Sequence, residues 1–439
     1  MACLEPIKDD EASERCRNTL RKVQPAPGIT SIATLIGISI LIKILVFVIQ
    51  LFYFRSYVDT WALNVYYETL VIPLAQGQLP YINYGWEYPI LMVIPVYISA
   101  FVSGILQNRP AFNLTFFELM AICDAISLTC VYLIAIKMYH NSRKAFIAGF
   151  LFATAFSTGY FMFTSFEAMP VCLVMVALTF TIYGDEWKGY LAILLGFFTK
   201  IFPLVLLPFI FLYSSKTSTM KAQVILLLKI AIPVIIVLMV PILIANPSSM
   251  GTYVARTEMQ KDVFASTLTY TIYQWLHGVF GINIAITTVA TFMTVVLVCI
   301  LLALAYIAYS TPVKDPFLLL KCSLIALVAL IACTKFNSPQ YMMWFTPIVC
   351  ILIAGSVRIA DEIPKIFVFY IFQVFEYVKY PLTWGILWEN YSYVAPVSTP
   401  GGVVSLLFFT VDYLVIFYLV FIITRKGRVH TPLGVKRPG

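Results

Sequence analysis

The sequence predicts an all-α integral membrane protein, a polytopic bundle of transmembrane helices. Hydrophobic residues make up 61% of its 439 residues and charged residues only 11%, whereas soluble domains are about half apolar and about a quarter charged. Apolar runs long enough to cross a bilayer recur along the chain. They lack the period-two alternation of strands, and open sheets cannot satisfy their backbone groups in lipid. We therefore expect about 11 to 13 spans, all helical.

The expected spans follow one another through most of the chain. They cover 29–54, 89–106, 114–136, 145–163, 170–183, 189–213, 222–245, 284–309, 316–333, 341–357, 363–375 and 403–424. The span at 189–213 contains Thr199-Lys200-Ile201-Phe202-Pro203. A lysine and a helix-breaking proline in mid-span predict a broken helix or a hairpin that lines a polar cavity.

Two polar tails, residues 1–28 and 425–439, flank a single membrane domain at 29–424. Basic residues lie next to the membrane in both tails, so the positive-inside rule predicts that both termini are cytoplasmic. The net charge of +8 therefore indicates orientation and not nucleic-acid binding. Simple alternation then places 137–144 outside, although its three basic residues favour the cytoplasm. We therefore expect one segment between Pro89 and Phe163 to be short, tilted or re-entrant.

The stretch after the first span, residues 57–89, carries the densest polar and aromatic chemistry of the chain. A linker needs only to be soluble, so this composition predicts a carbohydrate-handling surface. A carboxylate in a partly apolar pocket can remove a proton from a sugar hydroxyl, although Asp59 could also be an ordinary solvated residue. The acids of this stretch are Asp59, Glu68 and Glu87, and its candidate sugar-stacking rings are Tyr81, Trp86 and Tyr88.

Three further polar elements interrupt apolar sequence. Phe166-Glu167-Ala168-Met169-Pro170 could be an acidic site element or only a capped helix start. Lys200 could hold a phosphate leaving group or snorkel to an interface. The segment 334–347 could bind ligand or only cap a helix within an aromatic belt. Its candidate residues are Lys335, Gln340, Tyr341 and Trp344.

For the remaining charged residues and the cysteines, a structural role is the simpler interpretation. The segment 246–283 carries Arg256 and His277 and could be a lid over the site or a solvated loop. Asp124 and Asp412 lie within apolar spans, and we expect each to bond neighbouring helices to one another. Nine cysteines without a C-x-x-C spacing predict core residues, neither zinc ligands nor a disulfide framework.

Taken together, these elements resemble the GT-C superfamily of multi-span glycosyltransferases, and within it the polyprenyl-phosphate-mannose-dependent α-mannosyltransferases. The matches keep their order along the chain and extend from Asp59 to Pro347. They are an acid after the first span (Asp59), G-x-x-P-Y followed by E-Y-P (Gly77, Pro80, Tyr81, Glu87, Tyr88, Pro89), F-D/E-x-x-P (Phe166, Glu167, Pro170), T-K-x-x-P (Thr199, Lys200, Pro203) and K-x-x-S-P-Q-Y-x-x-W (Lys335, Ser338, Pro339, Gln340, Tyr341, Trp344). The family often has Asp at the position of Glu167, and the spacing after Asp59 leaves Glu68 as an alternative to it.

The resemblance implies an inverting transfer of a hexose, mannose in that family, from a polyprenyl phosphate to a lipid-linked or protein-linked glycan on the non-cytoplasmic face. The domain at 29–424 would then be the catalytic domain. Asp59, Glu68, Glu87 and Glu167 would supply catalytic carboxylates. Lys200, Lys335, Arg256 and Gln340 would hold the donor phosphate, and Tyr81, Trp86, Tyr88, Tyr341, Trp344 and His277 would contact sugar or acceptor. With cations on the leaving phosphate, no metal or other cofactor is required.

Two other functions remain open from the sequence alone. A secondary transporter would account for the spans, the broken helix at Lys200 and the acid Asp124, but it would not need the acidic and aromatic stretch 57–89. A non-catalytic subunit of a glycan-assembly complex would keep the aromatic residues and could dispense with Asp59. Short linkers suggest a prokaryotic, possibly archaeal, plasma membrane; an endoplasmic-reticulum membrane would give the same topology.

Overall fold

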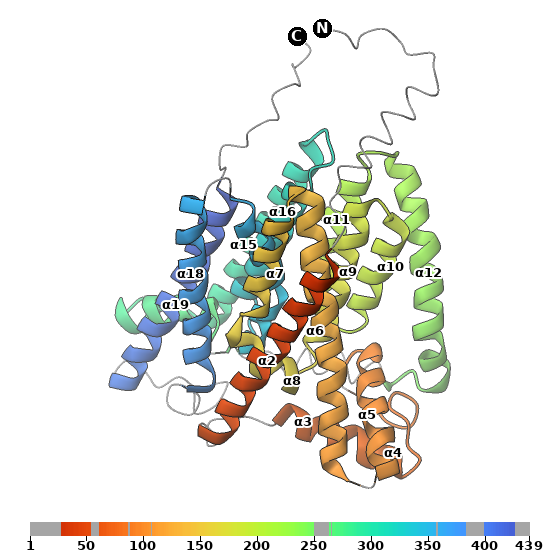
Figure 1. Cartoon of the computed structure of the whole chain (residues 1–439). Helices are drawn as coiled ribbons and strands as arrows, with labels where there is room; N and C mark the ends of the chain where they lie inside the picture. The colour runs from red at the N-terminus through yellow and green to blue at the C-terminus, as the bar shows by residue number, and fades with distance from the viewer. Residues whose placement is uncertain are drawn as a thin grey trace, which may run out of the picture.

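The computed structural model describes residues 28–53, 61–86, 88–106, 108–249, 263–264, 266–356, 359–382 and 399–425. Throughout these ranges the chain forms helices joined by short turns, and its one β-type contact is an isolated bridge between Pro80 and Tyr84. The helices pack as a bundle (Figure 1). The predicted all-α class is confirmed, and the chain is a multi-pass membrane protein.

Within the described ranges, the helices fall into long, short and irregular segments. The helices long and apolar enough to span a bilayer are α2 (Ile29–Tyr53), α6 (Arg109–Tyr139), α12 (Met220–Ala245), α15 (Ile286–Ser310), α16 (Pro316–Cys333) and α19 (Pro400–Thr424). The other α-helices are α3 (Trp61–Tyr66), α4 (Ile72–Ala75), α5 (Val93–Leu106), α7 (Ser142–Ala153), α8 (Gly159–Thr164), α9 (Ala168–Tyr183), α10 (Glu186–Phe197), α11 (Leu207–Ser214), α14 (Leu268–Tyr273), α17 (Thr346–Ala354) and α18 (Ile359–Tyr377). The 3-10 and π segments are η2 (Tyr67–Val71), η3 (Ile90–Met92), η4 (Phe156–Thr158), η5 (Phe202–Leu206), η6 (Gln274–Val279), η7 (Pro339–Trp344) and η8 (Val378–Leu382).

Every predicted span corresponds to helical structure, but the spans differ in kind. Six helices of the described residues can cross a membrane alone, and a seventh span results if α7 and the η4–α8 segment are counted together across their 44° bend. The remaining apolar segments are shorter helices. The expected total of about 11 to 13 therefore includes several half-spans, because hydropathy detects an apolar run but not whether the chain turns back within it.

Side-chain caps fix where several helices begin. Asn108 accepts a hydrogen bond from the backbone N–H of Ala111, at 2.8 Å, and Asn141 accepts from Arg143 at the start of α7. Asp315 and Thr399 cap α16 and α19, each directly before a proline in the first turn. A short polar cap followed by proline satisfies one free donor and removes another.

The acidic and aromatic stretch is more ordered than a simple loop. Its first part forms α3, η2 and α4, which lie at one end of the bundle beside α5 (Figure 1). Leu63, Tyr66 and Leu70 are buried, and their spacing of three and four residues places them on one helical face. An apolar face of this kind stabilises short helices by packing on the bundle.

Helix α5 resolves the conflict over the orientation of 137–144. It has only 14 residues, about 21 Å of helix, which is short of the roughly 30 Å of hydrocarbon. Arg109, just after α5, hydrogen-bonds Asn64 and lies over the ring of Tyr67. The chain therefore lies beside α3 and η2 again where α6 begins, so α6 runs from that end of the bundle to the other. The basic stretch 137–144 thus lies opposite the acidic and aromatic stretch.

Three helical hairpins line the centre of the bundle. The first hairpin consists of α7, η4, α8 and α9. Its first helix begins directly after α6, and Tyr183 at the end of α9 donates to Leu133 O of α6 at 3.1 Å. In the second, α10 and α11 are joined through η5. Glu186 at its start pairs with Lys314 at 2.8 Å, and Lys216 at its end donates to Tyr309 O at 2.8 Å. Both arms of this hairpin therefore end at the connection between α15 and α16, as predicted for the broken span.

The third hairpin consists of α16, η7 and α17. Phe317 at its start contacts Tyr139, with ring centroids 5.6 Å apart. Tyr139 also donates to Ile351 O near the hairpin's end, at 2.7 Å. All three hairpins therefore open towards the C-terminal end of α6, and their tips point into the bundle from the same side.

Two buried ion pairs connect helices within the bundle. Asp124 on α6 receives both Lys43 Nζ, at 2.6 Å, and Ser39 Oγ, at 3.0 Å, from α2. Asp412 on α19 lies 2.6 Å from Lys379 Nζ. The prediction that both acids bond helix to helix is confirmed. Lys43 was not anticipated, because a single lysine in an apolar run is also what a snorkelling residue looks like.

Candidate active site

The tips of the three hairpins meet at one carboxylate. Glu167, between α8 and α9, is fully buried. Lys200, at the tip of the second hairpin, forms an ion pair with its Oε1 atom. Trp344, at the tip of the third, donates from Nε1 to its Oε2 atom at 2.7 Å. Both carboxylate oxygens are therefore engaged, and a buried carboxylate with two charge-assisted bonds is held firmly in place.

Aromatic rings surround the ammonium group of Lys200. Its Nζ atom lies 4.4 Å from the ring centroid of Tyr341, 5.0 Å from that of Phe166 and 5.1 Å from that of Trp344. The negative faces of the rings stabilise the cation, and Glu167 neutralises it. The side chain is still 18% exposed, so this cation is accessible at the edge of the cluster.

Local sequence explains the turn that presents Lys200. Helix α10 ends at Phe197, and the N–H groups of Thr199 and Lys200 both bond to Gly196 O, at 3.0 and 2.9 Å. Pro203 then lies in the first turn of η5. A β-carbon on Gly196 would lie 3.2 Å from Pro203, so glycine permits the close approach of the two arms.

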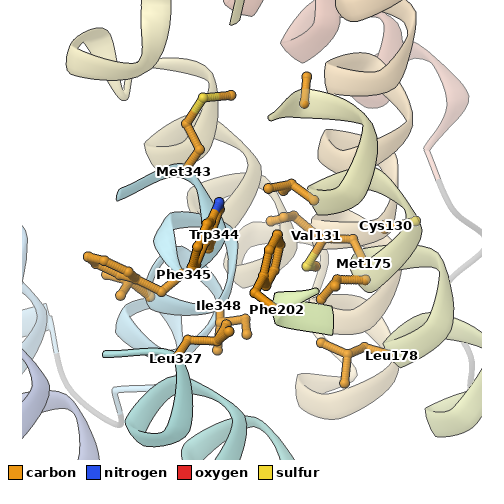
Figure 2. Close-up of a cluster of buried hydrophobic side chains, with 14 of the residues drawn as sticks. Cys130, Val131, Met175, Leu178, Phe202, Leu327, Met343, Trp344, Phe345 and Ile348 are labelled. Carbon is orange, nitrogen blue, oxygen red and sulfur yellow. The ribbon is translucent and has the colours of Figure 1, made fainter. Parts of the chain in front are cut away.

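Trp344 is sandwiched between two other rings. Its ring centroid is 4.1 Å from Phe202, with an interplanar angle of 8°, and 4.0 Å from Tyr341, with an angle of 25°. Figure 2 shows Trp344 beside Phe202, with Met175 and Val131 on the far side of Phe202. Both indole faces are thus covered and the N–H is bonded to Glu167. This geometry favours a supporting role for Trp344 and leaves Tyr341 at the outer end of the stack.

The acidic and aromatic stretch reaches this centre through Phe166. Tyr88 and Tyr66 contact the Phe166 ring with centroids 5.7 and 6.3 Å apart, and Trp86 lies 5.1 Å from Tyr88. The N–H of Leu91 donates to Phe198 O at 3.0 Å, which ties the end of this stretch to the second hairpin tip.

Backbone geometry shapes the turn at residues 76–89. Tyr81 is buried and has φ of +64°, in the left-handed region that few non-glycine residues adopt. Its hydroxyl donates to Tyr88 O. Tyr84 donates to Thr69 O at 2.7 Å, and Trp86 Nε1 donates to the hydroxyl of Thr69 at 3.0 Å. Burial raises the pKa of Tyr84 to about 12, so its phenol stays a hydrogen-bond donor at neutral pH.

The remaining candidates are distributed around this centre. Glu68 is exposed on η2, and Lys335 is exposed at the third hairpin tip. Gln340 accepts a hydrogen bond from Ser338. His277 is exposed on η6 and stacks on Tyr273, 5.1 Å away. Three candidates, Asp59, Glu87 and Arg256, lie outside the described residues.

Two residues of the centre were not among the candidates. Phe166 is the contact point for Lys200, Tyr66 and Tyr88, and Phe202 covers Trp344. Both stand inside recognised motifs, one position before Glu167 and one before Pro203, which was the available signal. The part of the chain that the structure describes holds no group of three or more His, Cys, Asp or Glu side chains arranged to bind a metal ion.

Comparisons with known proteins give similarities of fold. No protein-family model matches the chain, and no curated protein matches it. The solved structure of ArnT from Cupriavidus metallidurans bound to undecaprenyl phosphate is similar at 12% identity and a TM-score of 0.43, over 82% of this chain and 72% of that one. The apo oligosaccharyltransferase of Archaeoglobus fulgidus is similar at 12% identity and a TM-score of 0.41. AglB of that organism, in complex with an inhibitory peptide and a dolichol-phosphate, is similar at 11% identity and a TM-score of 0.41.

The chain covers 55% of each of the two archaeal chains, so it spans about half their length, and 90% of its own residues are matched.

Proposed function

We propose that the chain is a membrane glycosyltransferase. It moves a hexose, mannose in the first instance, from a polyprenyl-phosphate donor to a lipid-linked or protein-linked glycan acceptor on the non-cytoplasmic face. The observation that carries this proposal is the meeting of three motifs at one carboxylate. Glu167, Lys200 and Trp344 come from separate hairpins, 33 and 177 residues apart from Glu167 along the chain, and a purely structural role for each motif would not require them to converge.

Lys200 is the first contact for the donor phosphate. It is a partly exposed cation at a hairpin tip with aromatic surfaces on either side. As the bond from the anomeric carbon to phosphate oxygen breaks, negative charge grows on the departing lipid phosphate, and a fixed cation stabilises that charge. Lys335, Arg256 and Gln340 are the further donor-binding candidates.

Glu167 acts as the counterion that positions Lys200. It is fully buried, and each of its oxygens already accepts a bond, from Lys200 and from Trp344, an arrangement that favours the charged carboxylate over the protonated acid. We therefore assign proton removal from the acceptor hydroxyl to Asp59, with Glu68 and Glu87 as alternatives. The acceptor oxygen attacks the anomeric carbon from the face opposite the phosphate, which inverts its configuration, and the hydroxyl proton passes to the carboxylate.

Aromatic residues at the edge of the centre would contact the sugar and the acceptor. Tyr88 and Tyr341 are only partly buried and flank Lys200 and Phe166, so they are the preferred stacking surfaces. Tyr81 and Trp86 support the turn beneath them. His277 could contact the acceptor from η6.

The test is a reconstitution of purified protein in vesicles with radiolabelled polyprenyl-phosphate mannose and extracted glycolipid acceptor. Label in a new glycolipid supports the proposal. Label accumulated inside the vesicles without a new product would indicate a transporter, for which the buried ion pairs of Asp124 and Asp412 are the relevant feature. If label appears neither in a new glycolipid nor inside the vesicles, the chain is a non-catalytic subunit.

A further inference from the structure

A second buried polar cluster lies between α18 and α19, outside all the recognised motifs. Lys379 Nζ is 2.8 Å from Glu376 Oε1 and 2.6 Å from Asp412 Oδ2. The three side chains are at most 3% exposed. Removing three charges from water is costly, so such a cluster persists where it fixes a particular arrangement of helices.

The next residue of α19, Tyr413, connects this cluster to the third hairpin tip. Its hydroxyl donates to Ser266 O at 2.9 Å and accepts from Asn337 Nδ2 at 2.9 Å. Ser266 Oγ in turn donates to Asn337 O at 2.6 Å. All three residues are buried, so water cannot replace these bonds and each one contributes to the position of the tip.

Hydrogen bonds also fix the backbone of the segment that carries Lys335. The N–H of Phe264 donates to Lys335 O at 2.9 Å, two residues before Asn337. The Lys335 side chain itself is exposed. Its backbone is thus fixed from one side by Phe264 and from the other by Asn337, while its ammonium group extends from the tip.

We infer that Tyr413 is a positioning residue for the third hairpin tip, and that α18 and α19 belong to the active centre through it. The Glu376–Lys379–Asp412 cluster holds α19 in register, and Tyr413 transmits that register to Asn337 and Lys335. The consequence for donor binding rests on the proposed function, because the role of Lys335 at the lipid phosphate is part of that proposal.

The first experiment reads the position of the tip without any transfer reaction. Lys335→Cys is introduced and its modification rate by a water-soluble thiol reagent is measured, with protein lacking this cysteine as the blank. Tyr413→Phe removes the bridging hydroxyl and should change the rate several-fold. Tyr418→Phe is the matched control, because Tyr418 lies on the same helix and is 55% exposed. Equal rates in all three proteins would overturn the inference.

The second experiment reads donor use. Tyr413→Phe loses the hydrogen bond to Ser266 O and the one from Asn337. We expect it to raise the KM for the polyprenyl-phosphate donor by at least roughly three- to tenfold, the effect of one such bond, with little change in kcat. Combined with Lys335→Met, it should add little, because both act on the same contact. Fully additive effects would overturn the inference. Should Tyr413→Phe fail to accumulate, Asn337→Ser removes the bond from Asn337 Nδ2 to the tyrosine hydroxyl, together with the one from Nδ2 to Ser266 O, and serves in both experiments. A wild-type protein without transfer activity would refute the proposed function, while the thiol rates would still judge the positioning role.

Discussion

The residues of the centre have two roles: Lys200 presents a positive charge, and Glu167 and Trp344 fix its position. Lys200 is accessible, whereas Glu167 and Trp344 are buried and bonded to one another. A lysine that must meet a phosphate needs a counterion in the absence of substrate, since an unpaired charge in this setting is costly. The pair is therefore poised for exchange, with the phosphate taking over part of the role of Glu167.

Replacing the partly exposed Lys200 should weaken donor binding selectively. We expect Lys200→Met to raise the KM for the donor about tenfold to a hundredfold, because a charge-assisted contact contributes roughly 1.5–3 kcal/mol, with a smaller effect on the acceptor. The measurement is initial rate against donor concentration. Lys137→Met is the control, since Lys137 lies near the C-terminal end of α6, away from the hairpin tips, and over the ring of Tyr183. An unchanged donor KM in Lys200→Met would remove this residue from the site.

Removing one donor from Glu167 should disturb the centre while keeping its packing. Trp344→Phe keeps a ring between Phe202 and Tyr341 but loses the hydrogen bond of 2.7 Å, and we expect transfer to fall on the order of tenfold to a hundredfold, the cost of leaving a buried charged acceptor short of a partner. Trp275→Phe is matched to it, because it loses a 2.9 Å indole bond to Thr410. Similar activities in the two variants would argue against the supporting role of Trp344.

Replacing the proposed general base, Asp59, should lower kcat while leaving donor binding intact. Asp59→Asn preserves shape but cannot accept the acceptor proton, so we expect kcat to fall by about a hundredfold or more while the protein still inserts and binds donor. Glu68→Gln is the comparison, since Glu68 is exposed on η2. The assignment moves to Glu68 or Glu87 if Asp59→Asn retains near-native turnover and one of those variants loses it.

At the level of elements, the centre is made of interrupted helices. Each tip contributes a turn where a helix stops, after Thr164 of α8, after Phe197 of α10 and after Cys333 of α16. Interruptions leave backbone groups to be satisfied by turns and neighbours, which membrane proteins tolerate where the segment is covered by protein or lines a cavity. The break near Lys200 was predicted because proline and lysine both signal it. That Glu167, Lys200 and Trp344 belong to one site was expected from the motif resemblance. The ion pair and the indole hydrogen bond that join them were not predictable, because they depend on contacts between residues far apart in sequence.

The close approach within the second hairpin gives an element-scale prediction. We expect Gly196→Val to lower the free energy of unfolding by about 1–3 kcal/mol, the usual cost of overpacking, because its side chain would press on Pro203. Transfer should fall with it as Lys200 shifts. The measurement is thermal unfolding in detergent together with donor KM. Gly104→Val on α5 is the control, because nothing lies within 4 Å of the position of its β-carbon. Equal stability of the two variants would contradict the prediction.

At the scale of the whole molecule, charge and connectivity agree on one orientation. The ends of the hairpins carry Lys188, Lys216 and Lys314, and the stretch 137–144 adds further basic residues beside them. Helix α5 alone accounts for the apparent conflict in the sequence, because its failure to cross reverses the expected side of everything that follows it up to α9. Hydropathy could place each apolar segment but could not show which one was too short.

Orientation can be tested with one cysteine at each end. Gln78 and Arg143 are both exposed and lie at opposite ends of α6. In intact cells an impermeant thiol reagent should label Gln78→Cys, on the non-cytoplasmic side, and leave Arg143→Cys unlabelled until the membrane is opened. Labelling of Arg143→Cys alone would invert the protein, place the acidic stretch in the cytoplasm and contradict the use of an externally displayed lipid-phosphate sugar.

The second hairpin also constrains how the protein can be made. Its arms α10 and α11 have 12 and 8 residues, about 18 and 12 Å, so neither arm can cross the hydrocarbon by itself. The turn at Lys200 can pair with Glu167 of the preceding hairpin at once, but it lacks the cover of Tyr341 and Trp344 until α16, η7 and α17 have been synthesised. The nascent chain must therefore keep this hairpin sheltered for more than a hundred residues of synthesis. Chains that stop before Trp344 should be recognised as orphaned by membrane quality control and degraded.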